Sequence, residues 1–344
     1  MKLYHILIAI VVALSISSCE HKDLCYHHEH YTTLRLEFDW RDAPDANPSG
    51  MCVFFYPDDP SREVIRFDFK GLEGGEITVP QGRYRMLTYN NDTSGVLFSG
   101  KEDVEAHTAY TRTGGLFEPA GLPPSHGTRA PRAKGSEEED VVICPDMMWG
   151  CNAIDVDINE QGIFYICVPE SEKDIWIGKD PVHTEYVVTL FPHELTCIYT
   201  YEIINVANLE QANRMSASLS GMSPSLMLFS KELGRQCVTH PFEAIADRDN
   251  NRVTGRFITF GHHEENADPH KMMLYVWTND GKAYSYGADP KFDVTEQVHS
   301  APDRRRVHLI IDGLDIPKPI EPDPPAGLEP DVDDWQDENW EIIM

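Results

Sequence analysis

Leu34-Arg35-Leu36-Glu37-Phe38-Asp39-Trp40 is the stretch that decides the fold of this chain. Its four apolar residues alternate with three charged residues, which is a period of two. In an extended strand, successive side chains point to opposite faces, so this order places the apolar side chains on one face. Such a face is stable only when another layer of structure covers it. The stretch therefore predicts a half-buried strand in a layered β-structure.

Further strand candidates follow in both halves of the chain, separated by turn residues. In the first half they are Met51–Tyr56, Val64–Phe69, Glu76–Val79, Arg83–Tyr89, Val96–Ser99, Val104–Thr113, Val141–Cys144, Ile154–Ile158 and Ile163–Val168. In the second half they are Tyr186–Leu190, Leu195–Ile204, Val253–Phe260, Met272–Trp277, Lys282–Tyr286, Phe292–Val298 and Arg306–Asp312. Two short helices are predicted, at Leu209–Met215 and Pro241–Ala246, and a long surface loop at 114–140. Strands at this spacing predict an all-β chain built from sandwiches.

A polar stretch at 170–183 suggests a boundary between two domains. We expect an N-terminal β-sandwich over 31–180 and a C-terminal β-sandwich over 181–344. The second would end in a proline-rich linker and a terminal strand, 317–344, since Ile316–Pro330 holds six prolines. The apolar residues at the very end are expected to fold back as a last strand. The alternative is a docking strand for a partner, added to a sheet edge.

Residues 1–18 have the order of an export signal, with a basic residue, an apolar run and small residues. The apolar run Leu3–Leu14 is shorter than the roughly 20 residues that a helix needs to cross a bilayer. Ser17-Ser18-Cys19, which follows it, resembles the lipobox of bacterial lipoproteins. This resemblance implies that Cys19 is the lipidation site and first mature residue, and that 19–30 is a tether. A plain secretory peptide with an incidental cysteine is the alternative.

The charge of the chain limits its partners. Its 29 Lys and Arg residues face 57 Asp and Glu residues, which gives a formal net charge of −28. Nucleic acid is excluded as a partner because phosphates need Lys and Arg. Electrostatic docking on anionic lipid is disfavoured for the same reason. Attachment to a membrane would therefore depend on the acyl chains at Cys19.

With Cys19 lipidated, an odd number of cysteines remains, so at least one is unpaired. The seven are Cys25, Cys52, Cys144, Cys151, Cys167, Cys197 and Cys237. Cys52, Cys167 and Cys197 lie in apolar runs and are expected to be small buried hydrophobic residues. Cys144 and Cys151 could bridge a loop in an oxidising envelope. No C-x-x-C pair occurs, so a zinc ribbon or thioredoxin-like chemistry has no support.

The sequence contains no recognisable catalytic constellation. It lacks a G-x-S-x-G elbow, a P-loop and a dinucleotide fingerprint, so we expect no enzyme activity, no cofactor and no metal. Cysteine and histidines at 25–30 could bind a soft or borderline metal, but a polar leader is favoured. His262-His263-Glu264-Glu265 lacks the H-E-x-x-H spacing and is predicted to be a loop. Asp289–Asp293 lacks the ligand spacing of an EF-hand.

Several motifs together resemble one family of surface proteins. They are the lipobox with Cys19, Leu34-x-Leu36-x-Phe38-x-Trp40, Pro80-x-Gly82-x-Tyr84, Leu219-Ser220-Gly221-Met222, Phe257-x-Thr259-Phe260-Gly261, Phe292-Asp293-Val294-Thr295 and the terminal Trp335…Met344. With these residues, the chain resembles fimbrillin-related lipoproteins of gram-negative gut and oral anaerobes, especially fimbrial anchor subunits. The resemblance implies two tandem transthyretin-like, Greek-key β-sandwich domains after a lipidated tether.

The same resemblance implies a function. It suggests an outer-membrane lipoprotein, exposed at the cell surface, that anchors a fimbria or acts as an adhesin. Its partners would be the membrane, fimbrial subunits, or ligands on host or bacterial surfaces. The alternative is a polysaccharide-binding surface lipoprotein that uses aromatic platforms. Trp40, Trp176 and Trp277 are the candidates for these platforms, although core packing is the more frequent fate of such residues.

Overall fold

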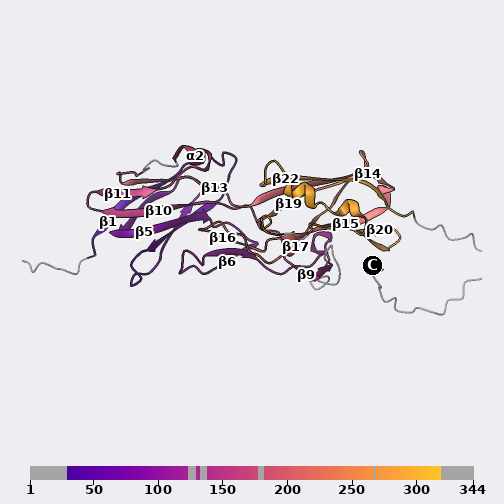
Figure 1. Ribbon diagram of the computed structural model, residues 1–344, viewed down its shortest axis with the longest axis horizontal. Helices are drawn as coiled ribbons and strands as arrows, with labels where there is room; N and C mark the ends of the chain where they lie inside the picture. Colours follow the sequence, from indigo (N-terminus) through magenta and orange to yellow (C-terminus); the bar gives the residue numbers. More distant parts are fainter. Residues whose placement is uncertain (1–28, 123–128, 132–137, 177–181, 267–268, 319–344) are drawn as a thin grey trace, which may run out of the picture.

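The computed structural model describes residues 29–122, 129–131, 138–176, 182–266 and 269–318. Within these ranges strands are the main element of the chain, and they are arranged in two groups along the long axis of the molecule (Figure 1). The prediction of an all-β chain with two sandwiches is confirmed. Residues 1–18, Cys19, most of the tether and 319–344 lie outside the described residues.

Two sheets face each other in the first sandwich. The smaller sheet has the order β12 (Val187–Leu190), β1 (Tyr31–Phe38) and β4 (Gly75–Pro80). The larger sheet has the order β11 (Gly162–Ile166), β10 (Trp149–Asn159), β5 (Gly82–Asn90), β2 (Gly50–Pro57) and β3 (Ile65–Lys70), and β13 (His193–Glu194) pairs with β10.

The first strand behaves as its pattern predicts. Leu34, Leu36 and Phe38 are buried in the core between the two sheets. Arg35 and Glu37 form an exposed ion pair at 2.8 Å on the other face. The alternation of apolar and charged residues thus sets which face of β1 meets the larger sheet.

The run Met51–Tyr56 in β2 is buried on both faces. Its odd-numbered residues enter the core of the sandwich, whereas Cys52, Phe54 and Tyr56 enter a second cluster on the opposite side. A third sheet covers that side, with the order β16 (Ser225–Met227), β7 (Thr108–Thr111) and β6 (Val96–Ser99). A continuous apolar strand is what burial on both faces requires.

The second sandwich has its own core between two sheets. One sheet has the order β18 (Ile245–Asp247), β19 (Arg252–Thr259), β14 (Cys197–Ala207) and β22 (Arg306–Asp315). The other has the order β21 (Ala283–Tyr286), β20 (Met272–Thr278), β15 (Ala212–Met222), β17 (Val238–Glu243), β9 (Glu138–Val141) and β8 (Arg129–Pro131). Short helices join these elements, namely η1 (Glu118–Ala120), η2 (Glu170–Glu172), α2 (Lys173–Trp176), η3 (Leu209–Gln211), η4 (Pro290–Phe292) and α3 (Thr295–His299).

The two halves of the chain exchange segments. Strand β9, from the first half, pairs in parallel with β17 of the second sandwich, and β16, from the second half, pairs with β7 (Figure 1). Arg305 also forms a bidentate ion pair with Glu170, with distances of 2.6 and 2.7 Å. The domain boundary between residues 180 and 181 stays a prediction. A strand from each side of it pairs with a strand from the other side.

Three local predictions are wrong. Residues 138–140, expected in the loop at 114–140, belong to β9, which lies between β17 and the edge strand β8. Leu209–Met215 is not a helix, because only η3 is helical there and Ala212 already begins β15. Pro241–Ala246 belongs to β17 and β18. In each case, pairing with neighbouring strands overrides the preference of the local sequence for a loop or a helix. Such a preference is weak compared with tertiary contacts.

Cys144 and Cys151, which the sequence allowed to form a bridge, are both free thiols. The thiol of Cys144 donates to the carbonyl of Pro241 at 3.3 Å, whereas Cys151 lies in the first core. Cys52 and Cys167 are buried as predicted, and Cys197 is half-buried. Burial raises the pKa of Cys52 to about 12, so this thiol is unreactive at neutral pH.

Among the helices within the described residues, none has the length and apolar character needed to cross a bilayer.

Candidate functional site

The outer edge of β19 is open over part of its length. Strand β18 pairs only with Arg252–Thr254 of β19, so within the described residues no strand pairs with Arg256 and Ile258 on that side. The backbone amide of Ile258 faces the thiol of Cys144, away from β14. Since backbone groups alternate in direction along an antiparallel pair, Arg256 also points its N–H and C=O outward. This short edge can accept hydrogen bonds from, and donate them to, an added strand.

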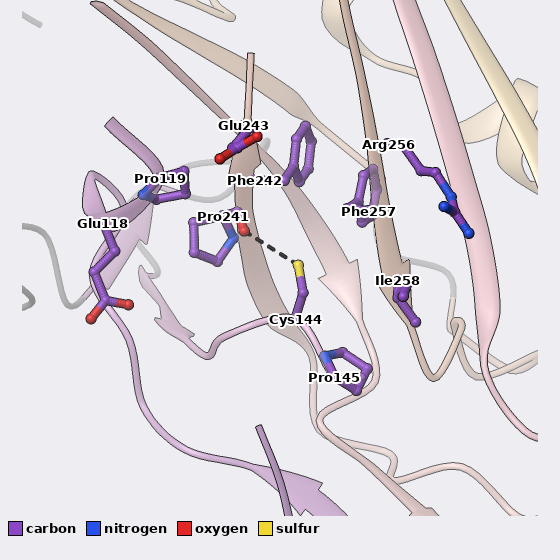
Figure 2. A pocket seen from close by; sticks show the side chains of 10 residues that line it. All are labelled: Glu118, Pro119, Cys144, Pro145, Pro241, Phe242, Glu243, Arg256, Phe257 and Ile258. Carbon is purple, nitrogen blue, oxygen red and sulfur yellow. Dashed lines mark hydrogen bonds between the residues drawn. The ribbon is translucent and has the colours of Figure 1, made fainter. Parts of the chain in front are cut away.

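A pocket of about 400 Å³ lies beside this edge, between the end of β17 and β19. Figure 2 shows its lining, which comes from η1, from the segment around Cys144, from the end of β17 and from β19. The rings of Phe242 and Phe257 stack in it, with centroids 3.9 Å apart. The pocket therefore combines an apolar wall with the outward-facing backbone groups of Arg256, which suits an extended peptide better than a small polar ligand.

Charged side chains from three elements also line the pocket. They are Glu118 of η1, Glu243 at the end of β17 and Arg256 of β19 (Figure 2). Cys144 lies between Pro241 and Ile258, and burial raises the pKa of its thiol to about 12. A neutral thiol at this position is a packing group and not a nucleophile.

Two neighbouring strands are each blunted at one position, which the open part of β19 is not. Pro241 has no N–H to offer at the free part of β17, and proline is a common means of blunting a strand edge. On β22, the opposite edge strand of the sheet, the side chain of Gln297 pairs with both backbone groups of Ile310, at 2.9 and 2.8 Å. We name the pocket and the open edge around Arg256 the β19 groove.

The candidate aromatic platforms are not flat exposed surfaces. Trp40, Trp176 and Trp277 are each half-buried. Trp40 donates to the carbonyl of Leu72 at 3.0 Å, and the ring of Trp277 packs edge-on against Phe117. Packing against the rest of the protein therefore buries most of the surface of these three side chains. Trp40 also lines an open pocket of about 600 Å³ beside β1.

The structure tests the predicted site residues only in part. Cys19, the predicted lipidation site, lies outside the described residues, as do the cysteine and two of the histidines at 25–30. His262 and His263 lie in the loop between β19 and β20, as expected. The β19 groove was missed, because its parts are far apart in the sequence. The one available signal was Pro241, whose lack of an N–H favours a strand edge.

The family is decided by comparison with known proteins. The domain of unknown function DUF5119 matches residues 18–243. The chain belongs to the DUF5119 family. One curated relative of this DUF5119 protein, from Bacteroides ovatus, is named as a candidate fimbrium-anchoring subunit, Fim4B. It is 30% identical over 109 residues, which are 31% of this chain and only 32% of the relative.

Solved structures resemble the DUF5119 chain over most of its length. A candidate adhesin from Bacteroides ovatus is 20% identical, with a TM-score of 0.57, and covers 85% of this chain and 95% of its own. The fimbrial anchor protein Mfa2 from Porphyromonas gingivalis is 12% identical, with a TM-score of 0.44, and covers 82% and 91%. The first of these shows a shared fold. The resemblance to fimbrial anchor subunits, predicted from the sequence, is confirmed.

Proposed function

We propose that this protein is a structural subunit of the cell surface, either the anchor of a fimbria or an adhesin. Acyl chains on Cys19 would hold it in the outer membrane, and the β19 groove would receive an extended segment of a partner subunit. The observation that carries the proposal is the open backbone edge at Arg256 beside an apolar pocket. The similarity to a candidate fimbrium-anchoring subunit supports the choice of partner.

The groove has the parts that strand addition requires. Backbone hydrogen bonds at an open edge supply affinity, and a pocket for alternate side chains supplies specificity. Arg256 provides the first, and the stacked rings of Phe242 and Phe257 provide the second. Gln297 occupies the outward backbone groups of Ile310 on β22, so strand addition is disfavoured at that point of the opposite edge.

Replacement of Arg256 by proline tests the groove. Arg256→Pro removes an outward-facing N–H and leaves the ladder between β14 and β19 intact, so we expect loss of partner binding from a folded protein. Arg256→Ala is the matched control, because it removes the charge but keeps the N–H, and it should still bind. The readout is photocrosslinking in cells from a reactive residue at Glu243, which lines the same pocket and is present together with either change at Arg256, with the captured protein identified by mass spectrometry.

The expected crosslinked partner is a fimbrial subunit, joined through an extended segment. A reactive residue at Ile310, on the capped edge of the same sheet, should give no such product. Equal capture from both positions, or capture unaffected by Arg256→Pro, would contradict the proposal. Retention on a polysaccharide array that is lost in Trp40→Ala would instead support glycan binding at the pocket beside β1.

Lipidation is tested separately. Cells fed a clickable fatty acid should label the wild-type protein, and Cys19→Ala should abolish the label and release the protein from the membrane fraction. Two or more acyl chains bind stably, since each buried CH₂ contributes about 0.8 kcal/mol. An unmodified thiol at Cys19 in the native protein, found by mass spectrometry, would show that another segment holds the protein.

A further inference from the structure

Three histidines from distant parts of the chain meet at one end of the second sandwich. His262 follows β19, His270 precedes β20 and His299 ends α3. One ring nitrogen of each lies within 4.8 Å of the others. The ring centroids are 4.9 to 5.1 Å apart. The nearest of these residues in sequence are eight positions apart, so only the fold brings them together.

The backbone holds His270 in one orientation. Its side chain is fully buried, and Nδ1 lies 3.1 Å from the carbonyl oxygen of Ser220. A carbonyl only accepts, so Nδ1 carries the proton and donates it, and Nε2 of the neutral ring presents a lone pair. This Nε2 lies 3.0 Å from Nε2 of His299.

Gly221 makes room for this arrangement. It lies at a shift of register in β15, with φ of +79°. A Cβ at this position would lie 2.8 Å from Nδ1 of His270, closer than such atoms approach. A glycine is therefore needed here both for the backbone conformation and for the histidine ring. The irregular backbone of β15 at Gly221 thus provides the space that the ring of His270 occupies.

His262 is the third member and is also oriented by a neighbour. Its Nδ1 lies 3.4 Å from the hydroxyl of Tyr199, a residue of β14. Neutral imidazole is the form that binds metal ions. Hydrogen bonds from the other ring nitrogen, as at His270, are the usual support of metal-binding histidines.

We infer that His262, His270 and His299 form a binding site for a borderline divalent transition metal ion, with Zn²⁺ as the best fit. Two nitrogen ligands of a tetrahedral Zn²⁺ lie about 3.3 Å apart, because each Zn–N bond is about 2.0–2.1 Å. The 3.0 Å separation of the two Nε2 atoms is close to this value. The ring of His299 is exposed and can adjust to bring the third ligand into place.

Three protein ligands leave a fourth coordination position open. His299 lines an open pocket of about 470 Å³ together with Asp293 and Glu296, which gives the site a path to solvent. Water, or a side chain of a bound partner, would take the fourth position. The ion would join the loop after β19, the start of β20 and α3. Because β19 and β20 belong to different sheets, the ion would link the two sheets at this end of the second sandwich and stabilise it.

The test is Zn²⁺ binding to the purified full-length protein, measured by calorimetry and by metal analysis after dialysis. We expect one Zn²⁺ per chain and a higher unfolding temperature with the ion. His299→Gln and His262→Gln should each weaken binding by more than about tenfold, since loss of even an indirect supporting group costs 10–100-fold. Both variants should also lose the rise in unfolding temperature. Neither removes the buried ring of His270, so both should fold.

Two controls separate this site from other histidines. His263→Gln changes a neighbour of His262 in the same loop, whose ring accepts from the amide of Glu265 and lies outside the cluster. A variant with His27 and His28 replaced by Gln tests the leader. Both should bind Zn²⁺ as the wild type does. The inference is overturned if the wild type binds no stoichiometric Zn²⁺, if His299→Gln binds it equally well, or if binding disappears with the leader histidines.

Discussion

Acidification from pH 7 to 4.5 is expected to destabilise this protein by several kcal/mol, before most carboxylates are protonated. Buried histidines contribute to the effect, because burial lowers the pKa of His107, His193 and His240 to about 4 each. His240 is fully buried, with Nδ1 3.1 Å from the carbonyl of Val142. Its Nε2 has no hydrogen-bond partner among the described residues. A proton there would place a charge in the core.

The sign of the effect follows from linkage. In the unfolded chain these histidines have a pKa near 6.5, so between pH 6.5 and 4 the unfolded state binds protons that the native state does not. Their stabilising contribution is complete above pH 6.5 and is lost as the pH falls toward 4. For His240 alone the shift corresponds to about 3 kcal/mol.

Urea unfolding at pH 7 and at pH 4.5, followed by tryptophan fluorescence, measures this loss. His240→Asn keeps a donor near the carbonyl of Val142 but does not titrate, so its stability should fall less between the two pH values. The substitution also lowers stability at pH 7, but this does not affect the test. The test compares the loss of stability between pH 7 and pH 4.5 in the variant with the same loss in the wild type. His308→Asn, at an exposed position on β22, is the control and should leave the difference unchanged. An equal loss in wild type and His240→Asn would contradict the explanation.

Leu228→Ala is expected to destabilise the whole chain by about 2–5 kcal/mol, as for other buried leucines. Leu228 belongs to the second half of the chain but is fully buried in the cluster that covers the first sandwich. Its amide donates to the carbonyl of His107 at 2.9 Å. Loss of the side chain leaves a cavity where the two halves exchange segments. Because β9 crosses in the other direction, both sandwiches should unfold in one transition.

Thermal unfolding observed by two probes tests this prediction. Far-UV circular dichroism and tryptophan fluorescence should give the same midpoint in the wild type, and the same lower midpoint in Leu228→Ala. Leu97→Ala is the matched control, because Leu97 is 45% exposed on β6, in the sheet that covers the same cluster. Its effect should stay within about 0.5 kcal/mol. Two separate transitions, with only one shifted by Leu228→Ala, would show that the halves are independent.

The sequence predicted strands well where one face had to be buried. The alternation in β1 was sufficient, since a period of two fits only an extended strand with one apolar face. It failed at Leu209–Met215, where good helix formers lie in a central strand. It also failed at 138–140, whose acidic residues suggested solvent. Glu139 is buried there, accepting from the hydroxyl of Thr239 and from the amide of Gly221, at 2.9 and 3.1 Å.

The candidate sites could not be predicted in the same way. Whether a strand edge stays open depends on where the neighbouring strand of the folded sheet ends. The groove at Arg256 is open because β18 pairs only with Arg252–Thr254 of β19. The histidine cluster has no sequence spacing of its own, because His262, His270 and His299 come from three different elements. The adjacent residues His262 and His263 lack a metal-binding spacing in the sequence. In the folded chain, the ring of His262 lies beside His270 and His299.

The sequence by itself determined the class of fold, the acidic net charge, and the resemblance to fimbrial anchor subunits. These depend on local patterns and on composition, which act at short range along the chain. Only the tertiary structure decided how the halves exchange β9 and β16, which strand edge stays open, and which histidines meet. Such features depend on contacts between residues far apart in sequence, and burial of apolar surface selects those contacts only when the whole chain has folded.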